Sequence, residues 1–384
     1  MNDLYWMILA GLAALYVVAE FLARFWLKVR NKYWVLSPHM HMVLEVDRET
    51  LPALEPEVHI RVNADGERGD PLPFTWNGTW RGLVVGGSAA ECYMLDQKSN
   101  WPQVMQDTLN ADGNANVLGA SRVHIGNVSR SLVACESLTR MLEKVLPRYQ
   151  RLDMVVLMVG ASDVVAWLEK DTPPRLEPGS LPAGRIFAEH PEGPFGWMPR
   201  QTALKRIAAR LNARFRHPIS RKKGAGKTIG KNRKMRAAAK TILHETPDPT
   251  PMVEFFETWF RRLIEMCHAR DIKVLVVRQP WFEKAFTAEE QKLLWNFGAG
   301  RPYEKELDTY YSHAVVCDLM RRVDEAAAHI AKETGADQLD LMPLLERSFE
   351  TYYDFLHFTP KGAKAVGEHV AHAILSKTEF REVE

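Results

Sequence analysis

The sequence has few cysteines and almost no excess charge. Its 384 residues include four cysteines, which are too few for a disulfide scaffold and lack the C-x-x-C spacing of a zinc ribbon: Cys92, Cys135, Cys267 and Cys317. They lie in apolar or helical surroundings, so we expect buried free thiols. The formal net charge is only +2. This balance argues against a general nucleic-acid binder and against an acidic solvating chain.

Nucleotide-binding and metal-binding motifs are also missing. Residues 224–228 (GAGKT) look like a phosphate loop, but Arg221 stands where that motif requires its first glycine. No G-x-G-x-x-G follows an expected strand, which argues against a Rossmann-type nucleotide site. The 13 histidines form no metal-binding pattern. We therefore expect no cofactor, no metal and no specific nucleic acid.

One long apolar run stands at the N-terminus. Residues 4–19 are apolar without interruption, and the run continues past Glu20 to Ala23. About 20 helical residues span the hydrocarbon core of a bilayer, roughly 30 Å. A cleaved signal peptide should open with basic residues, whereas this chain opens with Met-Asn-Asp. We favour a single-pass membrane anchor over residues 1–27, with membrane contact through 4–27, over a signal peptide or a buried core helix.

From Gly82 onward, short apolar segments alternate with amphipathic ones. We expect strands at 83–85, 116–118, 154–159, 273–277 and 338–341. We expect helices at 101–109, 128–146, 252–269, 304–334 and 360–375. Continuous apolar strands separated by helices indicate a parallel sheet covered on both faces. The predicted fold class is therefore α/β, a three-layer sandwich with a central parallel sheet, preceded by one N-terminal transmembrane helix.

The sequence predicts a lead-in, a main domain and an insertion. Residues 28–80 contain five prolines and little periodicity, which predicts an extended connection from the membrane. The main domain is expected over 81–378. A segment at 166–250, rich in proline and glycine and then in basic residues, interrupts it. A short tail at 379–384 follows.

The insertion is strongly basic. From Arg200 to Lys240 the chain has 15 lysines and arginines and no aspartate or glutamate. The remaining residues carry 35 basic and 48 acidic side chains, a formal net charge of −13. The near-neutral average therefore conceals a mildly acidic body and a basic segment. Residues 200–240 either bind anionic lipid or another polyanion, or form a solvated insertion without a partner.

Candidate groups for nucleophilic acyl transfer stand at the expected strand ends. That chemistry needs an activated hydroxyl, a histidine base, a carboxylate that orients the base, and donors for the oxyanion. Ser88 follows a strand at a turn that Gly87 allows to be tight. Asp354 and His357 stand three residues apart before the last helix, so one loop presents the base and its carboxylate. Each signal is weak alone, and their order makes the combination stronger.

These residues resemble the motifs of the SGNH (GDSL-like) hydrolase family, from about residue 82 to 375 without the insertion. Residues 86–88 (GGS) look like the first block, with glycine in place of the usual aspartate before Ser88. Residues 116–119 (NVLG) resemble the second block, whose glycine, here Gly119, supplies an N–H to the oxyanion hole. Asp354 to His357 (DFLH) resemble the last block, which implies a triad of Ser88, His357 and Asp354.

Four further segments resemble membrane-linked bacterial members of that family: 63–68, 101–102, 278–280 and 294–298. On this resemblance, Gln279 and Trp295 are candidates for the substrate pocket; core packing or a polar cap is the alternative. The family usually has Gly-x-Asn-Asp in its third block, whereas this chain has Ser162 in the place of the asparagine. We expect Ser162 to join the N–H groups of Ser88 and Gly119 in the oxyanion hole.

The resemblance implies a serine esterase that removes acetyl or short acyl groups from a glycan, a cell-envelope substrate or a small ester. Two alternatives remain: an O-acyltransferase acting on polysaccharide with the same triad, and a catalytically degenerate scaffold at the membrane surface. The family's habit implies a catalytic domain outside the cytoplasm. Basic residues after the apolar run favour the opposite side by the positive-inside tendency: Arg24, Lys28, Arg30 and Lys32.

Overall fold

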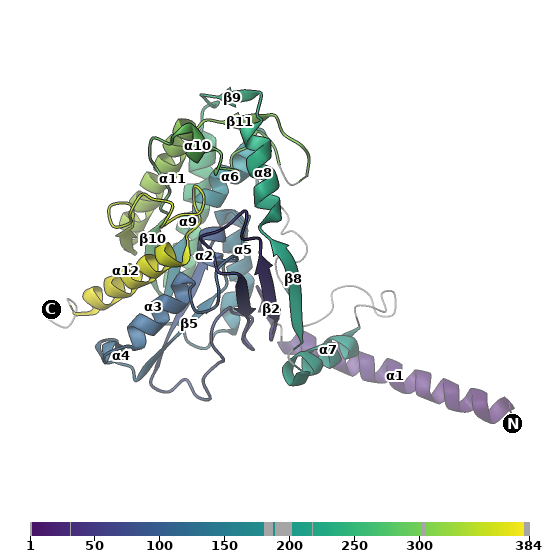
Figure 1. Cartoon of the computed structure of the whole chain (residues 1–384). Helices are drawn as coiled ribbons and strands as arrows, with labels where there is room; N and C mark the ends of the chain where they lie inside the picture. Colours follow the sequence, from purple (N-terminus) through teal and green to yellow (C-terminus); the bar gives the residue numbers. More distant parts are fainter. Residues whose placement is uncertain are drawn as a thin grey trace.

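A computed structural model describes residues 2–30, 32–179, 187–188, 202–216, 218–301 and 304–379 (Figure 1). Its centre is a parallel sheet of five strands: β4 (Thr79–Gly86), β5 (Arg122–Asn127), β6 (Met154–Met158), β10 (Lys273–Arg278) and β12 (Asp337–Asp340). The spatial order is β5-β4-β6-β10-β12, with every neighbouring pair parallel. Numbered along the chain this is the doubly wound order 2-1-3-4-5. The strand order reverses between β4 and β6, and ligands bind beyond the carboxyl ends at such a point.

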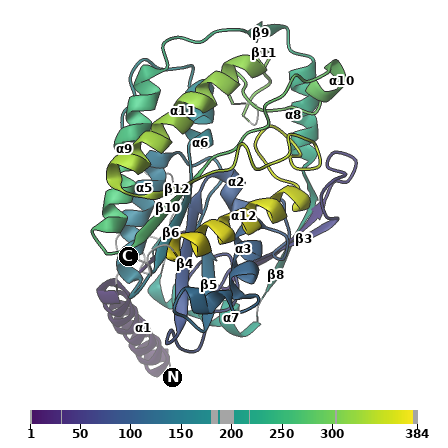
Figure 2. The ribbon, with the colours of Figure 1, turned by 90° about the vertical axis from the view of Figure 1, so that its left-hand side faces the viewer.

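Helices cover both faces of this sheet. One face packs against α5 (Cys135–Val145), α6 (Ala161–Glu169), α9 (Thr250–His268) and α11 (His313–Thr334). The other packs against α3 (Trp101–Asn110) and α12 (Pro360–Glu379), which lie together in front of the sheet in Figure 2. Successive β4 residues divide between the two cores, since Leu83 and Val85 face one and Val84 the other. The predicted three-layer α/β sandwich is confirmed.

The predicted strand at 116–118 is wrong. Gly113, whose φ of 80° is left-handed, starts the short helix α4 (Asn114–Val117), and the second strand of the sheet is β5 instead. The hydrophobic pattern did not reveal β5 (RVHIGN), because this strand buries polar side chains, among them His124 and Asn127. The helices expected at 128 and 304 begin later, at Cys135 and His313.

The predicted lead-in contributes a second small sheet to the body. In residues 28–80, β1 (Tyr33–Trp34) is followed by the antiparallel pair β2 (His41–Val46) and β3 (Glu57–Arg61). The insertion adds β8 (Ile219–Ala225), which pairs parallel with β2. Apolar residues of β2 and β3 join the same core as α3 and α12, for example Leu44 and Val58.

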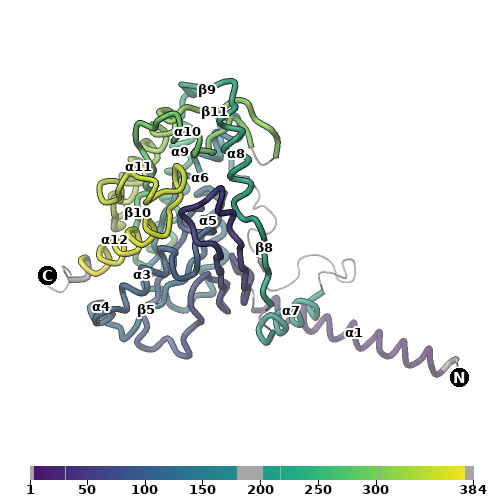
Figure 3. Tube along the Cα trace, in the orientation of Figure 1, coloured from purple at the N-terminus to yellow at the C-terminus, as the bar shows by residue number. Residues whose placement is uncertain are grey.

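The rest of the insertion runs along the molecule. From α7 (Ala203–Arg216) at the base, the chain passes through β8 to α8 (Lys227–Ala237) near the opposite end (Figure 3). Short elements complete the described chain: α2 (Ser88–Glu91), the 3-10 turn Leu146–Arg148, β7 (Phe187–Ala188), β9 (Thr241–Leu243), α10 (Ala288–Gln291) and β11 (Thr309–Tyr311). Much of the insertion's Pro/Gly-rich part and the tail after Glu379 lie outside the described residues.

The N-terminal apolar run forms α1 (Asn2–Arg30), which projects from the base of the body (Figure 1). In the described part of the chain it is the one helix long and apolar enough to cross a membrane. Its first 15 described side chains, 4–18, are exposed. Further along, Glu20 and Leu27 are buried against the rest of the protein.

Candidate active site

Ser88 begins α2 immediately beyond the carboxyl end of β4. The two glycines before it are required by close packing. A Cβ on Gly86 would stand 2.2 Å from the carbonyl oxygen of Met158 in β6, and one on Gly87 would stand 2.6 Å from the Ser162 Oγ. The tight turn therefore brings the Ser88 hydroxyl out of the sheet beside the end of β6, at the point where the strand order reverses.

The loop before α12 carries His357 and Asp354 to the same place. The Nε2 atom of His357 lies 2.7 Å from the Oγ of Ser88, although 269 residues separate them. On the other side of the ring, Nδ1 lies 2.8 Å from Oδ2 of Asp354. A carboxylate only accepts hydrogen bonds, so Nδ1 carries the proton and Nε2 accepts from the Ser88 hydroxyl. A continuous hydrogen-bonded chain runs from serine to carboxylate.

Asp354 is held rigidly in its ionised form. It is fully buried, and Oδ1 accepts hydrogen bonds of 2.9 Å from the N–H groups of Leu356 and His357. Burial by itself raises the pKa of this carboxyl, but the nearby His357 and these hydrogen bonds more than offset that effect, so the pKa lies below its ordinary value. The carboxylate thus orients the imidazole and stabilises a positive charge on it.

Trp295 contacts the carboxylate directly. Its indole N–H donates a 2.7 Å hydrogen bond to Oδ2 of Asp354, the oxygen that also faces His357. The rings of Trp295 and Tyr353 both lie nearly parallel to the imidazole, at interplanar angles of 9° and 11°. Trp295 therefore does more than line a pocket: it holds the Asp354 carboxylate, which in turn orients the His357 imidazole.

A cavity of about 360 Å³ opens beside Ser88 and His357. Most of its lining is apolar, from the segment after α2, the loop before α12 and helix α8 of the insertion. Two asparagines interrupt that lining, Asn232 of α8 and Asn296 of the Trp295 loop. Both are more than nine-tenths buried, and within the described chain the amide oxygen of each has no hydrogen-bond partner. A buried amide oxygen without a donor is costly, so these two side chains are the polar groups of the lining that are least satisfied within the described chain.

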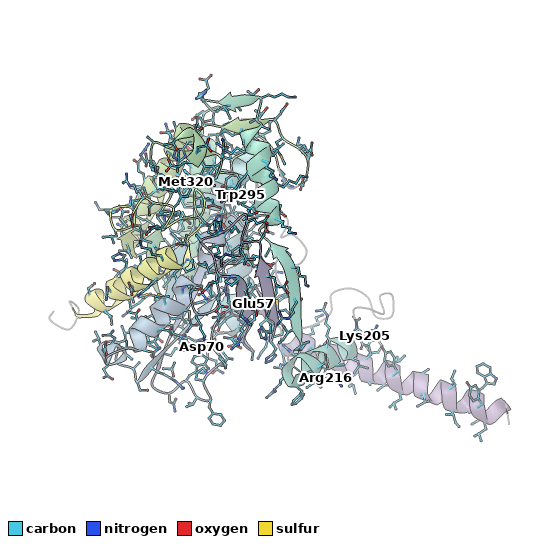
Figure 4. The ribbon with its side chains drawn as sticks, viewed as in Figure 1. Glu57, Asp70, Lys205, Arg216, Trp295 and Met320 are labelled. Carbon is cyan, nitrogen blue, oxygen red and sulfur yellow. The ribbon has the colours of Figure 1, made fainter. Side chains whose placement is uncertain are left out.

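Basic residues of the insertion hold the site together. Arg233 donates to the carbonyl oxygens of Tyr353 and Leu293 at 2.8 Å each, and also to that of Thr50. Arg236 donates to the carbonyl oxygen of Asn296 at 2.7 Å. Burial lowers the pKa of both guanidinium groups, to about 10 for Arg236. These two charges are therefore committed inside the protein. Figure 4 shows Trp295 beside α8.

Ser162 lies at the site, and Gly119 does not. Ser162, the second residue of α6, lines the same cavity as Ser88 and His357. Gly119 precedes β5, whose first residue pairs with Thr79 at the start of β4, so it lies at the opposite end of the sheet from Ser88. Its N–H donates to the carbonyl oxygen of Asn116. The placement of Gly119 in the oxyanion hole was wrong because residues 116–119 precede strand β5, whereas groups at the carboxyl edge of the sheet follow a strand.

The N–H of Ser88, at the start of α2, makes no hydrogen bond within the described chain. It remains available for an oxyanion. Gln279 is buried and lines a small adjoining cavity with Ser88 and Ser162, where its amide donates to the carbonyl oxygen of Pro280. Within the described ranges, no group of three or more His, Cys, Asp or Glu side chains could hold a metal ion.

Arg68 is a residue whose role the sequence did not reveal. It is buried and donates to the carbonyl oxygens of Glu91, Cys92 and Leu95, at 2.5 to 2.8 Å. Arg68 therefore fixes the end of α2 and the cavity wall that follows Ser88. The family likeness at 63–68 indicated that this segment matters, but only the tertiary structure shows which groups Arg68 contacts. Asp163, next to Ser162, accepts from the N–H of Cys135 at the start of α5.

The strand order and the hydrogen-bonded series of Ser88, His357 and Asp354 define the class: a doubly wound α/β protein with the arrangement of a serine-hydrolase triad. No protein-family model and no curated protein sequence matches the chain.

Among solved structures, the chain is similar to Axe2, an acetylxylan esterase from Geobacillus stearothermophilus, with 12% identity over 78% of this chain and 94% of that one at a TM-score of 0.40. It is similar to the psychrotrophic esterase EstA from a Pseudoalteromonas species, with 11% identity over 78% and 98% at 0.39. It is also similar to a lipase/acylhydrolase from Enterococcus faecalis, with 12% identity over 78% and 96% at 0.39. At such TM-scores the fold assignment depends on the strand order described above.

Proposed function

We propose that this protein is a serine esterase of the SGNH type that hydrolyses acetyl or short acyl esters. One observation carries the proposal: the hydrogen-bonded series of Ser88, His357 and Asp354 at the carboxyl edge of a parallel sheet, next to a cavity. The sequence motifs at 86–88 and 354–357 support the same family.

In the proposed first step, Nε2 of His357 takes the proton of the Ser88 hydroxyl as Oγ attacks the ester carbonyl carbon. The Asp354 carboxylate stabilises the imidazolium that forms, and Trp295 keeps the carboxylate in place. Collapse of the tetrahedral intermediate expels the alcohol, which receives the proton from His357. Water, activated by the same imidazole, then releases the acid and restores the Ser88 hydroxyl.

The oxyanion would be met by the N–H of Ser88 and the hydroxyl of Ser162. Ser88 and Ser162 line the same cavity, and in the described chain neither the Ser88 N–H nor the Ser162 hydroxyl is engaged by another group. Because Gly119 lies at the far end of the sheet, it has no part in the proposed oxyanion hole. A hydroxyl is shorter than the usual asparagine amide, so Ser162 has to lie close to Ser88. A Cβ at Gly87 would stand 2.6 Å from the Ser162 Oγ, so the Ser162 hydroxyl lies beside the turn that carries Ser88.

An acylated glycan is the proposed substrate. Asn232 and Asn296 line the cavity, and amide groups can exchange hydrogen bonds with sugar hydroxyl groups. The apolar remainder of the lining suits the acyl group and the faces of sugar rings. Gln279 is proposed to support the floor of this pocket next to Ser88.

We propose that α1 anchors the enzyme in the cell membrane as a single span, with the catalytic domain outside the cytoplasm. The exposed apolar surface of residues 4–18 supports the anchor. Contacts of Glu20 and Leu27 with the body support a retained helix over a cleaved signal sequence. Labelling of intact cells with a fluorophosphonate tests the side: labelling only after permeabilisation would favour the cytoplasmic placement that the basic flank indicates.

The central experiment compares Ser88→Ala with the wild type on p-nitrophenyl acetate and in fluorophosphonate labelling. Hydrolysis and labelling should both disappear in Ser88→Ala, whereas its thermal unfolding temperature should stay that of the wild type. Ser376→Ala, an exposed serine on α12, is the matched control and should leave both signals unchanged. Undiminished hydrolysis by Ser88→Ala would refute the proposal. Product analysis with a glycan acceptor present separates hydrolysis from acyl transfer, because a transferase delivers the acyl group to the acceptor instead of to water.

A further inference from the structure

Helix α7 has a surface that neither the catalytic site nor the body uses. Its inner side packs on the protein: Ala203 is buried, and the Arg210 guanidinium lies 4.2 Å from the ring centroid of Trp34. Its outer side combines apolar and basic residues. Ala208, Leu211 and Phe215 follow at helical spacing and are exposed, Leu211 by 49% and Phe215 by 75%.

Exposed basic side chains flank this apolar stripe: Lys205, Arg214 and Arg216. The helix contains no aspartate or glutamate. An exposed apolar stripe bordered by positive charge, on a helix of 14 residues, is the pattern of a helix that lies in a membrane interface. Figure 4 shows Lys205 and Arg216 on α7, next to the inner end of α1.

The membrane-type helix itself fixes α7 in this position. The carboxylate of Glu20 in α1 accepts hydrogen bonds from the N–H groups of Ala203 and Leu204, at 2.7 and 3.0 Å. These are two of the unpaired donors that begin α7, and a carboxylate there also complements the helix dipole. Arg24 donates to the same carboxylate at 2.8 Å. A polar residue at the end of the apolar run thus joins α1 to α7 where α1 leaves the bilayer.

The position along α1 agrees with the depth of an interface. From Leu4 to Glu20 the helix rises about 24 Å, and to Trp26 about 33 Å, at 1.5 Å per residue. The contact with α7 therefore comes near the end of a hydrocarbon core of roughly 30 Å. Around it the apolar side chains of Phe21, Phe25 and Trp26 are exposed. Helix α7 therefore begins at the level where α1 presents exposed apolar side chains.

We infer that α7 is an interfacial helix whose stripe (Ala208, Leu211, Phe215) enters the headgroup region and whose flanking basic residues (Lys205, Arg214, Arg216) bind anionic phospholipid. We place the site on α7 because its basic residues flank an exposed apolar stripe, whereas Arg233 and Arg236 of α8 donate to carbonyl oxygens within the protein. Lipid binding by α7, together with the Glu20 contact, would hold the body at a fixed orientation to the membrane. The inference rests on the proposed anchoring by α1 and not on the proposed hydrolase activity.

The test uses the full-length chain in nanodiscs of phosphatidylcholine, with or without phosphatidylglycerol. An environment-sensitive fluorophore is attached to a cysteine introduced by Phe215→Cys. The four native cysteines are buried, so the introduced thiol is the one that reacts in the folded protein. Leu344→Cys labels an exposed position in the loop after β12 as the aqueous control, and Leu9→Cys labels α1 as the anchor control.

We expect the label at 215 to shift to the blue and to be quenched by lipid-borne spin labels when phosphatidylglycerol is present. Salt should weaken the effect. Lys205→Glu with Arg216→Glu should lower the ratio of lipid-bound to free α7 at least tenfold, from roughly fivefold for each basic side chain removed. Glu20→Gln should reduce the difference between the labels at 215 and 344.

The inference is overturned if the label at 215 resembles the one at 344 in both lipids while the label at 9 is embedded. It is equally overturned if the label at 215 responds only to a soluble polyanion, or only to protein concentration, because a different partner then covers the stripe. A label at 9 that stays in water refutes the anchor itself, which distinguishes the two failures.

Discussion

Replacing Trp295 by phenylalanine tests the proposal that the tryptophan positions the catalytic carboxylate. The change removes one indole N–H and retains an aromatic ring. In the wild type that N–H donates a 2.7 Å hydrogen bond to Oδ2 of Asp354, whose side chain is fully buried. The fully buried carboxylate loses one of its donors, so we expect the cost to fall on the geometry of the proposed triad.

The magnitude follows from the kind of bond removed. Hydrogen bonds to charged groups contribute about 1.5–3 kcal/mol. At 1.36 kcal/mol for each factor of ten, the largest expected loss in kcat/KM is about 10- to 150-fold. Because Leu356, His357 and its ring still bind the carboxylate, we expect the lower part of this range. With one donor fewer for its charged form, the pKa of Asp354 should be higher in the variant than in the wild type, so activity should fall off sooner as the pH is lowered.

The assay is the pH dependence of kcat/KM on p-nitrophenyl acetate, with thermal unfolding measured in parallel. Trp167→Phe is the matched control, because the indole of this buried tryptophan also donates a hydrogen bond, to the carbonyl oxygen of Pro173, outside the site. An equal loss in both variants would mean that packing, and not the bond to Asp354, is responsible. Full activity of Trp295→Phe would refute the positioning role.

Three further predictions concern other parts of the site. Ser162→Ala should lower kcat by up to about 10²-fold with little change in KM, because an oxyanion donor acts in the transition state; a change confined to KM would contradict that role. Arg233→Ala should lower both activity and thermal stability. Lys234→Ala, which changes an exposed neighbour on α8, should alter neither. Equal behaviour of the two variants would refute the structural role assigned to Arg233. Burial raises the pKa of Asp163 to about 7. The stability that this group contributes is therefore complete below about pH 4 and is lost as the pH rises to 7. Asp163→Asn should stabilise the protein at pH 8 by no more than about 4 kcal/mol and not at acidic pH, which denaturant unfolding at the two pH values measures.

The strongly apolar strands were predictable from the sequence because their positions depend on local patterns. Four of the five strands of the main sheet fall where strands were predicted, and three of these, β4, β6 and β10, coincide with apolar runs. The exception, β5, alternates polar residues that find buried partners far along the chain. The Asn127 amide, for instance, donates to the carbonyl oxygen of Ala90. No local pattern predicts such partners.

The insertion shows the same limit more strongly. Its charge predicted a solvated segment or a polyanion-binding surface, yet α8 supplies a wall of the cavity and Arg233 binds the loop that carries Asp354 and His357. A count of basic residues cannot distinguish an arginine that donates to buried carbonyl oxygens from one that remains in water. Whether a basic residue of α7 or α8 is buried or exposed depends on which side of its helix packs against the body.

The sequence by itself determined the fold class, the apolar N-terminal helix and the three residues proposed as the triad. Strand ends and a short Asp-x-x-His loop can be identified locally, and in a parallel sheet the groups that follow the strands gather at its carboxyl edge. The tertiary structure alone decided the partners around Ser88: it joined Trp295 to Asp354, added Asn232 of the insertion to the cavity wall and left Gly119 at the other end of the sheet. The physical reason is that a buried polar group takes whichever partner the packing brings near, and packing is a property of the whole chain.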